Sequence, residues 1–332
     1  MSHKLNHFFD SMWYGKRVVA LLFVPLSWLF AVVIKLRVYL YKKGYLKSTR
    51  LSVPVIIVGN ITVGGTGKTP LVIWLAELLK KAGYSPGVIS RGYGGIASSW
   101  PQQVRADSDA RVVGDEAKIL AARTNCPVAV GPVRADSAQA LIDHHGCNII
   151  ISDDGLQHYA LQRDIEIVLV DGERRQGNGY LLPAGPLREP VSRLQTADLI
   201  VCNGLANNNE FPLRVEGDRA VNILDASKSR ALSEFSQQSC HALAGLGNPS
   251  RFFAHLKKFG LRFDSNIFPD HYKYSQQDIS FDDDKTVLMT EKDAVKCSTI
   301  ASDKHWYVPI KAAMSEKFSL SLLALIKEKT NG

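Results

Sequence analysis

One short segment, TVGGTGKT at residues 62 to 69, restricts the fold of this 332-residue chain more than any other. It stands between an apolar run at residues 53 to 60 and an amphipathic stretch at residues 69 to 83, which predict a buried strand and a helix. In that setting the glycine turn and the first turn of the helix bind phosphate through backbone N–H groups, and a lysine reaches the terminal phosphates. The pattern is a P-loop with Thr62 in the place of the usual first glycine; the alternative is a glycine-rich turn before an unrelated helix.

The P-loop predicts that a nucleotide is the cofactor, and we favour ATP. The residues expected to hold its phosphates are Thr62, Val63, Gly64, Gly65, Thr66, Gly67, Lys68 and Thr69. Guanine-binding proteins of this class commonly carry NKxD, whereas TEKD at residues 290 to 293 has Glu291 in the place of the lysine. A second glycine pattern, Gly245 and Gly247, has Ser250 where a dinucleotide-binding motif has its third glycine, so we discount it.

An acidic pair follows a later apolar run. Asp153 and Asp154 come directly after NIIIS, residues 148 to 152, at the predicted carboxyl end of a strand. Ligand sites of α/β sheets form at that edge, and a P-loop enzyme needs a carboxylate near Mg²⁺. We therefore expect Thr69, Asp153 and Asp154 to be the metal-binding residues, with either acid as the direct ligand. The alternative is an ordinary acidic turn.

From residue 53 onward, short apolar runs alternate with longer amphipathic stretches, which is the pattern of a parallel sheet with crossover helices. After residue 203 the apolar segments become shorter and less regular. We expect an α/β fold: a P-loop NTPase-like parallel sheet with flanking helices, a second, smaller α/β domain, and an N-terminal membrane-associated helix. The expected domains are residues 1–47 (membrane anchor and basic flank), 48–205 (P-loop kinase domain) and 206–332 (C-terminal α/β domain).

The N-terminal run at residues 18 to 34 has no ionisable side chain and contains Pro25, which would kink it. As a helix it would be roughly 25 Å long, a little short of a bilayer core. Residues 1 to 50 hold nine Lys or Arg and one acid, whereas the rest of the chain is neutral, so the net charge of +8 is not a nucleic-acid signal. Basic flanks of this kind suit anionic headgroups on the cytoplasmic side. The alternative is a buried core helix.

Four further clusters carry side chains suited to phosphoryl transfer. Arg91 follows a predicted strand in SRGYGG, and Asp115 opens a helix in GDE. Arg188 lies in the Pro-Gly loop LLPAGPLREP, and His271 follows a proline and an acid in FPDHY. A helix cap would explain Asp115 by itself. An arginine such as Arg188 or Arg91 would hold the γ-phosphate while a carboxylate takes a proton.

Taken together and in this order, TVGGTGKT, SRGYGG, GDE, SDDGLQH, LLPAGPLRE, GxGNPxRFF, FPDHY and TEKDAVK resemble the tetraacyldisaccharide 4'-kinase family, the lipid A 4'-kinases of Gram-negative bacteria. The likeness covers nearly the whole chain, including the membrane segment. It implies transfer of the ATP γ-phosphate to the 4'-hydroxyl of a tetraacylated disaccharide 1-phosphate, which forms lipid IVA at the cytoplasmic face of the inner membrane.

The resemblance also implies site residues. A catalytic Asp–His dyad falls on Asp115 and His271. The needs of phosphoryl transfer add Lys68 and Arg188 as the other expected catalytic residues. Arg91, Gln157 and His158 are expected to contact the substrate. The partners are then the acylated lipid and an anionic membrane surface, with no nucleic acid and no obligate protein.

Two other functions share part of this pattern. A membrane-recruited P-loop ATPase acting as a switch would need the P-loop, the acids and the basic anchor, but not FPDHY. A GTP-binding regulator would need the missing NKxD. The presence of an acceptor lipid separates a kinase from both.

Overall fold

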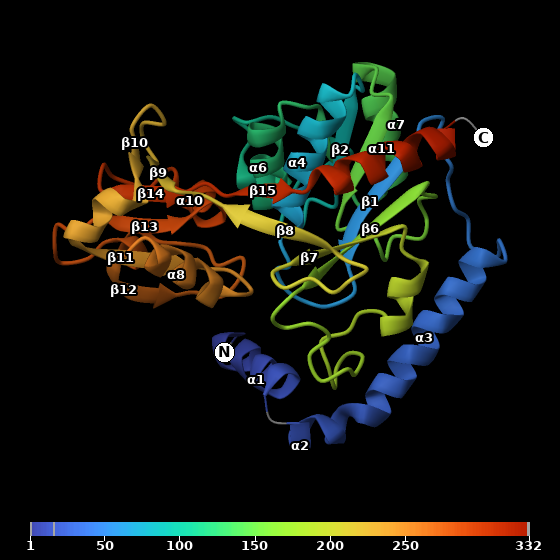
Figure 1. The fold of residues 1–332 in the computed structure, drawn as a ribbon, viewed down its shortest axis with the longest axis horizontal. Helices are drawn as coiled ribbons and strands as arrows, with labels where there is room; N and C mark the ends of the chain where they lie inside the picture. The colour runs from blue at the N-terminus through green and yellow to red at the C-terminus, as the bar shows by residue number, and fades with distance from the viewer. Residues whose placement is uncertain (1, 16, 331–332) are drawn as a thin grey trace.

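The computed structural model describes residues 2–15 and 17–330, which form two β-sheets with helices packed on them (Figure 1). The larger sheet has nine strands in the order β15-β8-β7-β6-β1-β5-β2-β4-β3. Neighbouring strands run parallel except at the two edges of the sheet, where β3 is antiparallel to β4 and β15 is antiparallel to β8. The strands are β1 (Val55–Asn60), β2 (Pro86–Ser90), β3 (Gln102–Val104), β4 (Val128–Val130), β5 (Ile149–Asp153), β6 (Ile165–Asp171), β7 (Leu199–Asn203), β8 (Phe211–Glu216) and β15 (Lys311–Met314).

Helices cover both faces of this sheet because its central strands are apolar on both sides. Ile56 and Val58 of β1 pack with α4 (Lys68–Lys81), α6 (Asp115–Thr124) and α11 (Glu316–Thr330). Val55 and Ile57 point the opposite way and pack with α7 (Arg134–His145). A short helix, α5 (Ala110–Val113), precedes α6, and the turn η2 (Val191–Thr196) precedes β7. The predicted α/β layering with a parallel sheet is confirmed.

The smaller sheet lies beside the larger one and has the order β10-β9-β14-β13-β11-β12. Its strands are β9 (Arg219–Asn222), β10 (Ser229–Ala231), β11 (Ser239–Ala244), β12 (Arg262–Ile267), β13 (Val287–Thr290) and β14 (His305–Val308). Its helical segments are η3 (Leu232–Gln237), α8 (Pro249–Lys258), α9 (Gln276–Ile279) and α10 (Glu291–Cys297). Phe235 and Leu256 are buried in its own core.

The chain crosses between the two sheets twice, which corrects the predicted boundary at residue 206. β8 pairs with β7 and with β15, so both β8 and β15 belong to the larger sheet (Figure 1). Phe318 and Leu322 of α11 are buried in the core of that sheet. The strands of the smaller sheet therefore span residues 219–308 rather than 206–332. Short strands of similar composition do not reveal in sequence which partner they pair with.

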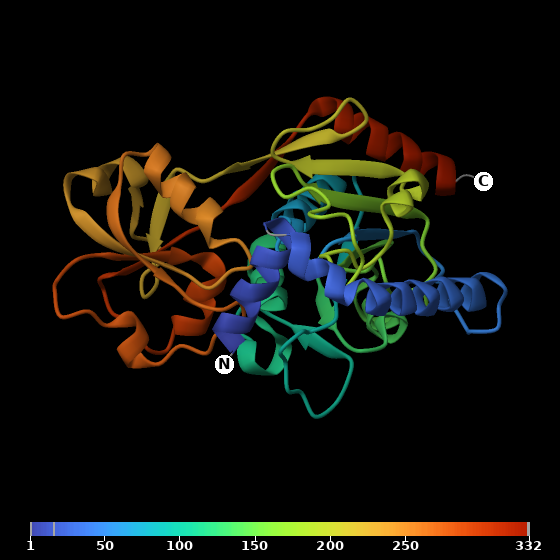
Figure 2. The ribbon, with the colours of Figure 1, turned by 90° about the horizontal axis from the view of Figure 1, so that it is seen from below.

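The N-terminal helices lie along the side of the molecule opposite α11, in front when the molecule is seen from below (Figure 2). They are α1 (Ser2–Tyr14), α2 (Arg17–Ala20), η1 (Leu21–Phe23) and α3 (Val24–Lys42). Pro25 lies in the first turn of α3, where a backbone N–H would have no partner within the helix, so the proline does not kink α3. The irregular part of the run is the 3₁₀ turn at Leu21–Phe23, just before α3. Ser27 fixes α3 to the protein by donating to the Leu181 carbonyl, 2.8 Å away.

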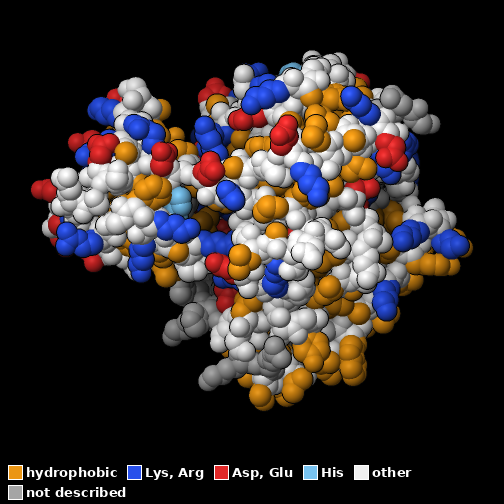
Figure 3. Space-filling model, viewed as in Figure 1, with side chains coloured by type: hydrophobic (Ala, Val, Ile, Leu, Met, Phe, Trp, Pro, Cys, Tyr) orange, Lys and Arg blue, Asp and Glu red, His pale blue; other side chains and the backbone are white. Residues whose placement is uncertain are grey.

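The segment 18–42 is the one helical stretch in the described part of the chain that is long and apolar enough to cross a membrane. Val18 and Leu22 are 78% and 79% exposed, and Trp28 and Leu29 are 68% and 62% exposed. In the space-filling view, hydrophobic side chains gather along the lower part of the molecule, where Figure 1 shows the N-terminal helices (Figure 3). A buried core helix would not leave such side chains in solvent, so the structure argues against that alternative.

Candidate active site

The P-loop occupies the predicted position between β1 and α4, in the middle of the larger sheet. β1 is flanked by β5 and β6, both parallel to it, so the carboxyl ends of all three strands meet at one edge. Gly64 and Gly67 have φ angles of 108° and 99°, which residues with a Cβ rarely adopt. Lys68 begins α4, and its Nζ lies 3.3 Å from Asn60 Oδ1 and 3.5 Å from Asp154 Oδ1.

The two expected metal-binding acids differ in their surroundings. Asp154 Oδ2 lies 3.2 Å from Arg188 Nη1, and although burial opposes its ionisation, Lys68 and Arg188 lower the pKa of Asp154. Asp153 is 1% exposed, and its Oδ1 has no hydrogen-bond partner among the described residues. Burial, then the charges of Glu116 and Asp154, raise the pKa of Asp153 to about 7. Of the pair, Asp153 is the carboxylate with an oxygen that has no hydrogen-bond partner among the described residues.

The buried Asp153 oxygen without a hydrogen-bond partner fits a cation. The described residues contain no group of three or more His, Cys, Asp or Glu able to hold a metal. Mg²⁺, however, commonly takes one or two protein ligands and completes its shell with water and substrate phosphates. The P-loop Thr69 and the buried Asp153 are the donors that suit such a site, while Asp154 already contacts Lys68 and Arg188.

The expected dyad is brought together from the two sheets. Asp115 starts α6, and His271 lies in a loop after β12 with a φ of 58°. Asp115 Oδ2 is 3.4 Å from His271 Nδ1, an ion-pair separation without the alignment of a hydrogen bond. The Tyr93 ring lies against the imidazole, with 4.8 Å between ring centroids. The helix-cap alternative for Asp115 is wrong, because Gly114 holds the cap position.

Asp115 is ionised at neutral pH. Burial opposes this, but His271, Lys292 and Lys296 outweigh it and hold the pKa of Asp115 below its usual value. A carboxylate in that state has a free electron pair with which to accept a proton.

Lys292 is a site residue that the sequence analysis passed over. Its Nζ lies 2.8 Å from Glu116 Oε1, 3.0 Å from Asp270 Oδ1 and 3.5 Å from His271 Nε2. Burial by itself would lower the pKa of Lys292, but the two carboxylates raise it. The TEKD motif, rejected as a guanine signal, therefore places a cation beside the dyad. Nothing in the sequence around Lys292 indicates that this lysine lies beside His271.

Arg134 is a second residue that was missed. It is 3% exposed at the start of α7, donates to Ser152 Oγ at 2.6 Å, and donates to the Asp154 carbonyl at 2.8 Å. A buried arginine at the carboxyl edge fixes the turn that carries both acids. Its position after the short strand β4 was the only hint in the sequence.

The loop that carries Arg188 lies alongside the P-loop. The Arg188 N–H donates to the Ile61 carbonyl at 2.7 Å, and the Val63 N–H donates to the Pro186 carbonyl at 2.8 Å. These backbone bonds place the Arg188 guanidinium at the same edge as Lys68. Arg188 is therefore close enough to the P-loop to contact a phosphate bound there, as expected for a loop arginine.

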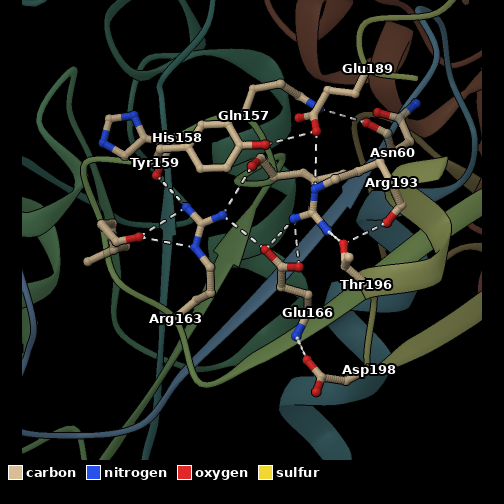
Figure 4. Close-up of polar contacts among 12 residues, drawn as sticks. Asn60, Gln157, His158, Tyr159, Arg163, Glu166, Glu189, Arg193, Thr196 and Asp198 are labelled. Carbon is tan, nitrogen blue, oxygen red and sulfur yellow. Dashed lines mark hydrogen bonds and ion pairs between the residues drawn. The ribbon is translucent and has the colours of Figure 1, made fainter. Parts of the chain in front are cut away.

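The expected substrate residues divide into two groups. Gln157 belongs to a buried network, because its Nε2 donates to Glu189 Oε1 at 3.0 Å and to the Asn60 carbonyl at 3.1 Å (Figure 4). Tyr159 and Arg193 also contact Glu189, which is 2% exposed. This network fixes the residue that follows Arg188.

His158 and Arg91 lie at the same edge. His158 is half-buried, and burial together with nearby arginines lowers the pKa of His158 to about 4, so its imidazole is neutral at neutral pH. Arg91 is exposed directly after β2, close enough for its charge to contribute to that lowering. Neutral imidazole and exposed guanidinium groups suit a polar, phosphate-bearing ligand.

Known proteins resemble this chain over nearly its whole length. The family model described as tetraacyldisaccharide-1-P 4'-kinase matches residues 19–327. The tetraacyldisaccharide 4'-kinase of Nitrosococcus oceani is 50% identical over 316 residues, 95% of this chain and 93% of the relative. That of Methylobacillus flagellatus is 48% identical over 337 residues, covering 99% and 100%. The crystal structure of LpxK from Aquifex aeolicus in complex with ATP superposes with a TM-score of 0.78 at 28% identity, covering 93% of this chain and all of that one.

Proposed function

The chain belongs to the tetraacyldisaccharide-1-P 4'-kinase family and is thus a kinase of lipid A biosynthesis, and we propose how its residues divide the work. The reaction moves the γ-phosphate of ATP to the 4'-hydroxyl of tetraacyldisaccharide 1-phosphate, forming lipid IVA. The observation that carries the proposal is that the acidic pair adjoins both the P-loop and the start of α6: Lys68 Nζ lies 3.5 Å from Asp154, and the charge of Glu116, next to Asp115, acts on Asp153. A P-loop and a positioned acid–base group are the two parts that phosphoryl transfer to an alcohol needs.

ATP binds through the P-loop, with Lys68 and Arg188 on its terminal phosphates. In the structure these two cations lie on Asp154, at 3.5 and 3.2 Å, so the charge that receives the phosphates is already assembled. Asp153 and Thr69 hold Mg²⁺. When bound, the metal neutralises charge on the phosphate oxygens. The complex of the Aquifex relative with ATP supports this nucleotide choice.

Asp115 is the base. As the 4'-oxygen forms its bond to the γ-phosphorus and the bond to the β–γ bridging oxygen breaks, the hydroxyl proton passes to Asp115 and ADP leaves. His271, 3.4 Å away, orients the carboxylate and shares its charge. Lys292 holds Asp270 and His271 in place from α10. Because Asp115 and His271 come from the two sheets, the base is complete only when the sheets are apposed, which limits idle hydrolysis of ATP.

The N-terminal helices place this site at a membrane surface. The exposed apolar side chains of residues 18–36 enter the lipid, while Lys35, Arg37, Lys42 and Lys43 are exposed and meet anionic headgroups. The acyl chains of the substrate stay in the bilayer and only its sugar headgroup reaches the base. The location is the cytoplasmic face of the bacterial inner membrane, where ATP is available, and the proposal requires no nucleic acid or obligate protein partner.

The direct test is incubation of the purified protein with γ-labelled ATP and lipid carrying tetraacyldisaccharide 1-phosphate. We expect label on the lipid, dependent on Mg²⁺, and little release of labelled phosphate when lipid is omitted. The competing switch ATPase predicts the reverse: hydrolysis without lipid and no label on lipid.

A triple variant, Leu22→Gln, Trp28→Gln and Leu29→Gln, tests the membrane contact while keeping the Ser27 bond. Each change removes an exposed apolar side chain worth roughly 1.5–3 kcal/mol on burial, so vesicle binding should fall at least about tenfold. Activity on lipid in vesicles should fall in parallel, whereas activity on detergent-dispersed lipid should change little. A control with Leu205→Gln and Leu224→Gln, which are also exposed, should behave as wild type. Equal losses on both forms of substrate would contradict the membrane role.

A further inference from the structure

The segment of residues 245–251, GLGNPSR, leads from β11 into α8 and lies directly against the P-loop. A methyl group on Gly247 would be 3.1 Å from the Gly65 backbone nitrogen and 3.5 Å from the Gly64 Cα. Two glycine turns from different sheets therefore approach backbone to backbone. This close approach explains why residue 247 is a glycine, since a side chain there would crowd the P-loop backbone. The discounted dinucleotide-binding pattern gave no such explanation.

An arginine from the larger sheet reaches across to this segment. Arg174 lies in the loop after β6, and its Nη1 donates to the Gly247 carbonyl at 3.0 Å. The same nitrogen is 3.9 Å from where a methyl group on Gly64 would lie. The other face of the guanidinium covers the Tyr14 ring at the end of α1, 4.9 Å from its centroid.

A second arginine reaches in the opposite direction. Arg251 Nη2 lies 2.6 Å from Asp171 Oδ1 and donates to the Asn203 carbonyl at 3.2 Å. Asp171 and Asn203 are register partners at the carboxyl ends of β6 and β7. Asn203 Nδ2 donates in turn to the Thr66 carbonyl of the P-loop at 2.9 Å.

The two arginines form a reciprocal contact, which we call the latch: Arg174 and Arg251 with their partners Gly247, Asp171 and Asn203. Asp171 is only 4% exposed, so its side of the bond to Arg251 is shielded from water, and a partly buried charged hydrogen bond of that kind is stronger than a surface ion pair. Each half of the latch also touches the P-loop or its immediate support. The latch therefore ties the position of the smaller sheet to the shape of the phosphate site.

We propose that residues 245–251 form a wall of the nucleoside triphosphate site contributed by the smaller sheet, and that the latch sets the affinity for ATP. The proposal deepens the proposed function and rests on it for the identity of the nucleotide. Arg174 and Arg251 are positioning residues, because they act through the P-loop and the glycine segment. The contacts of the two arginines are with the P-loop side of the site, namely Gly247, Asp171, Asn203 and Glu173, so we expect the latch to influence nucleotide binding more than the phosphoryl-transfer step.

The test is the variant Arg251→Met, assayed for KM and kcat and for the rise in Tm that ATP produces without lipid. Loss of the charged hydrogen bond to Asp171, together with the weaker contacts to Asn203 and Glu173, predicts a KM for ATP raised about tenfold. The value of kcat should stay within about twofold, since binding common to the ground and transition states is lost. The ATP-induced rise in Tm should shrink correspondingly. Arg262→Met, an exposed arginine of the same sheet, is the matched control and should keep wild-type values.

The partner variant Asp171→Asn should give a similar KM, and the double variant should be barely worse than either single one, because both remove the same contact. Should Arg251→Met fail to fold, Gly247→Val decides, since its side chain displaces the segment from Gly65 without touching either arginine's charge. Unchanged ATP affinity in a folded variant, or a fall in kcat at constant KM, would overturn the latch. Lack of label on lipid with intact ATP binding by the wild type would instead overturn the proposed function alone.

Discussion

Replacing Lys68 with alanine is expected to lower phosphoryl transfer by about 10²- to 10³-fold, the loss typical of removing one preorganised charge from a transition state. Lys68 is the P-loop cation, and its Nζ already points at the acidic pair, 3.5 Å from Asp154. Without Lys68, the γ-phosphate loses a cation whose attraction to the phosphate oxygens increases as negative charge develops on them in the transition state. The measurement is label transfer from ATP to lipid at saturating concentrations of both substrates.

The fold should survive this change. Asp154 keeps Arg188 at 3.2 Å, and Arg134 still donates to its backbone carbonyl, so Asp154 is not left without a partner. Lys81→Ala, at the exposed end of the same helix, is the matched control and should retain full activity. Wild-type turnover by a folded Lys68→Ala protein would remove the P-loop from the mechanism.

The second large effect concerns Asp115 and His271. Each single alanine substitution is expected to lower kcat by about 10²- to 10⁴-fold, the range for a positioned acid–base group, with little change in the KM for ATP. The physical reason is that Asp115 supplies the electron pair for the hydroxyl proton, and His271, 3.4 Å away, keeps that carboxylate oriented. The measurement is steady-state kinetics with both substrates varied. His144→Ala, on the exposed end of α7, should leave kcat unchanged.

The double variant separates a dyad from two independent residues. Groups that act as one unit are not additive, so Asp115→Ala with His271→Ala should be barely slower than the slower single variant. Losses that multiply would assign the two residues separate roles and end the dyad interpretation. A rise only in the KM for ATP would move Asp115 into the nucleotide site.

Features set by local sequence were predicted well. The P-loop, its strand and its helix follow from glycine positions and apolar periodicity between residues 53 and 83, and β1 and α4 occupy those places. The strand end at Asp153 was located for the same reason. The N-terminal helix was also evident, because seventeen residues without a charge have few other structures open to them.

Sheet membership was predicted less well. β8 and β15 are short strands whose composition does not differ from that of the smaller sheet, yet they pair with each other and complete the larger one. Backbone hydrogen bonds between strands carry no side-chain signature, so a boundary drawn at residue 206 could not detect the second crossing.

The sequence by itself determined the chemistry that this chain can carry: a phosphate cradle, acids at a strand end, and an apolar helix with basic flanks. The tertiary structure decided which distant residues share that chemistry. Asp115 meets His271, Lys292 contacts both Glu116 of α6 and His271, and Arg251 crosses to Asp171. These contacts join residues 80 or more positions apart, except for the one within the smaller sheet. Such contacts depend on how two sheets pack, and packing is selected by shape and buried charge rather than by any spacing along the chain.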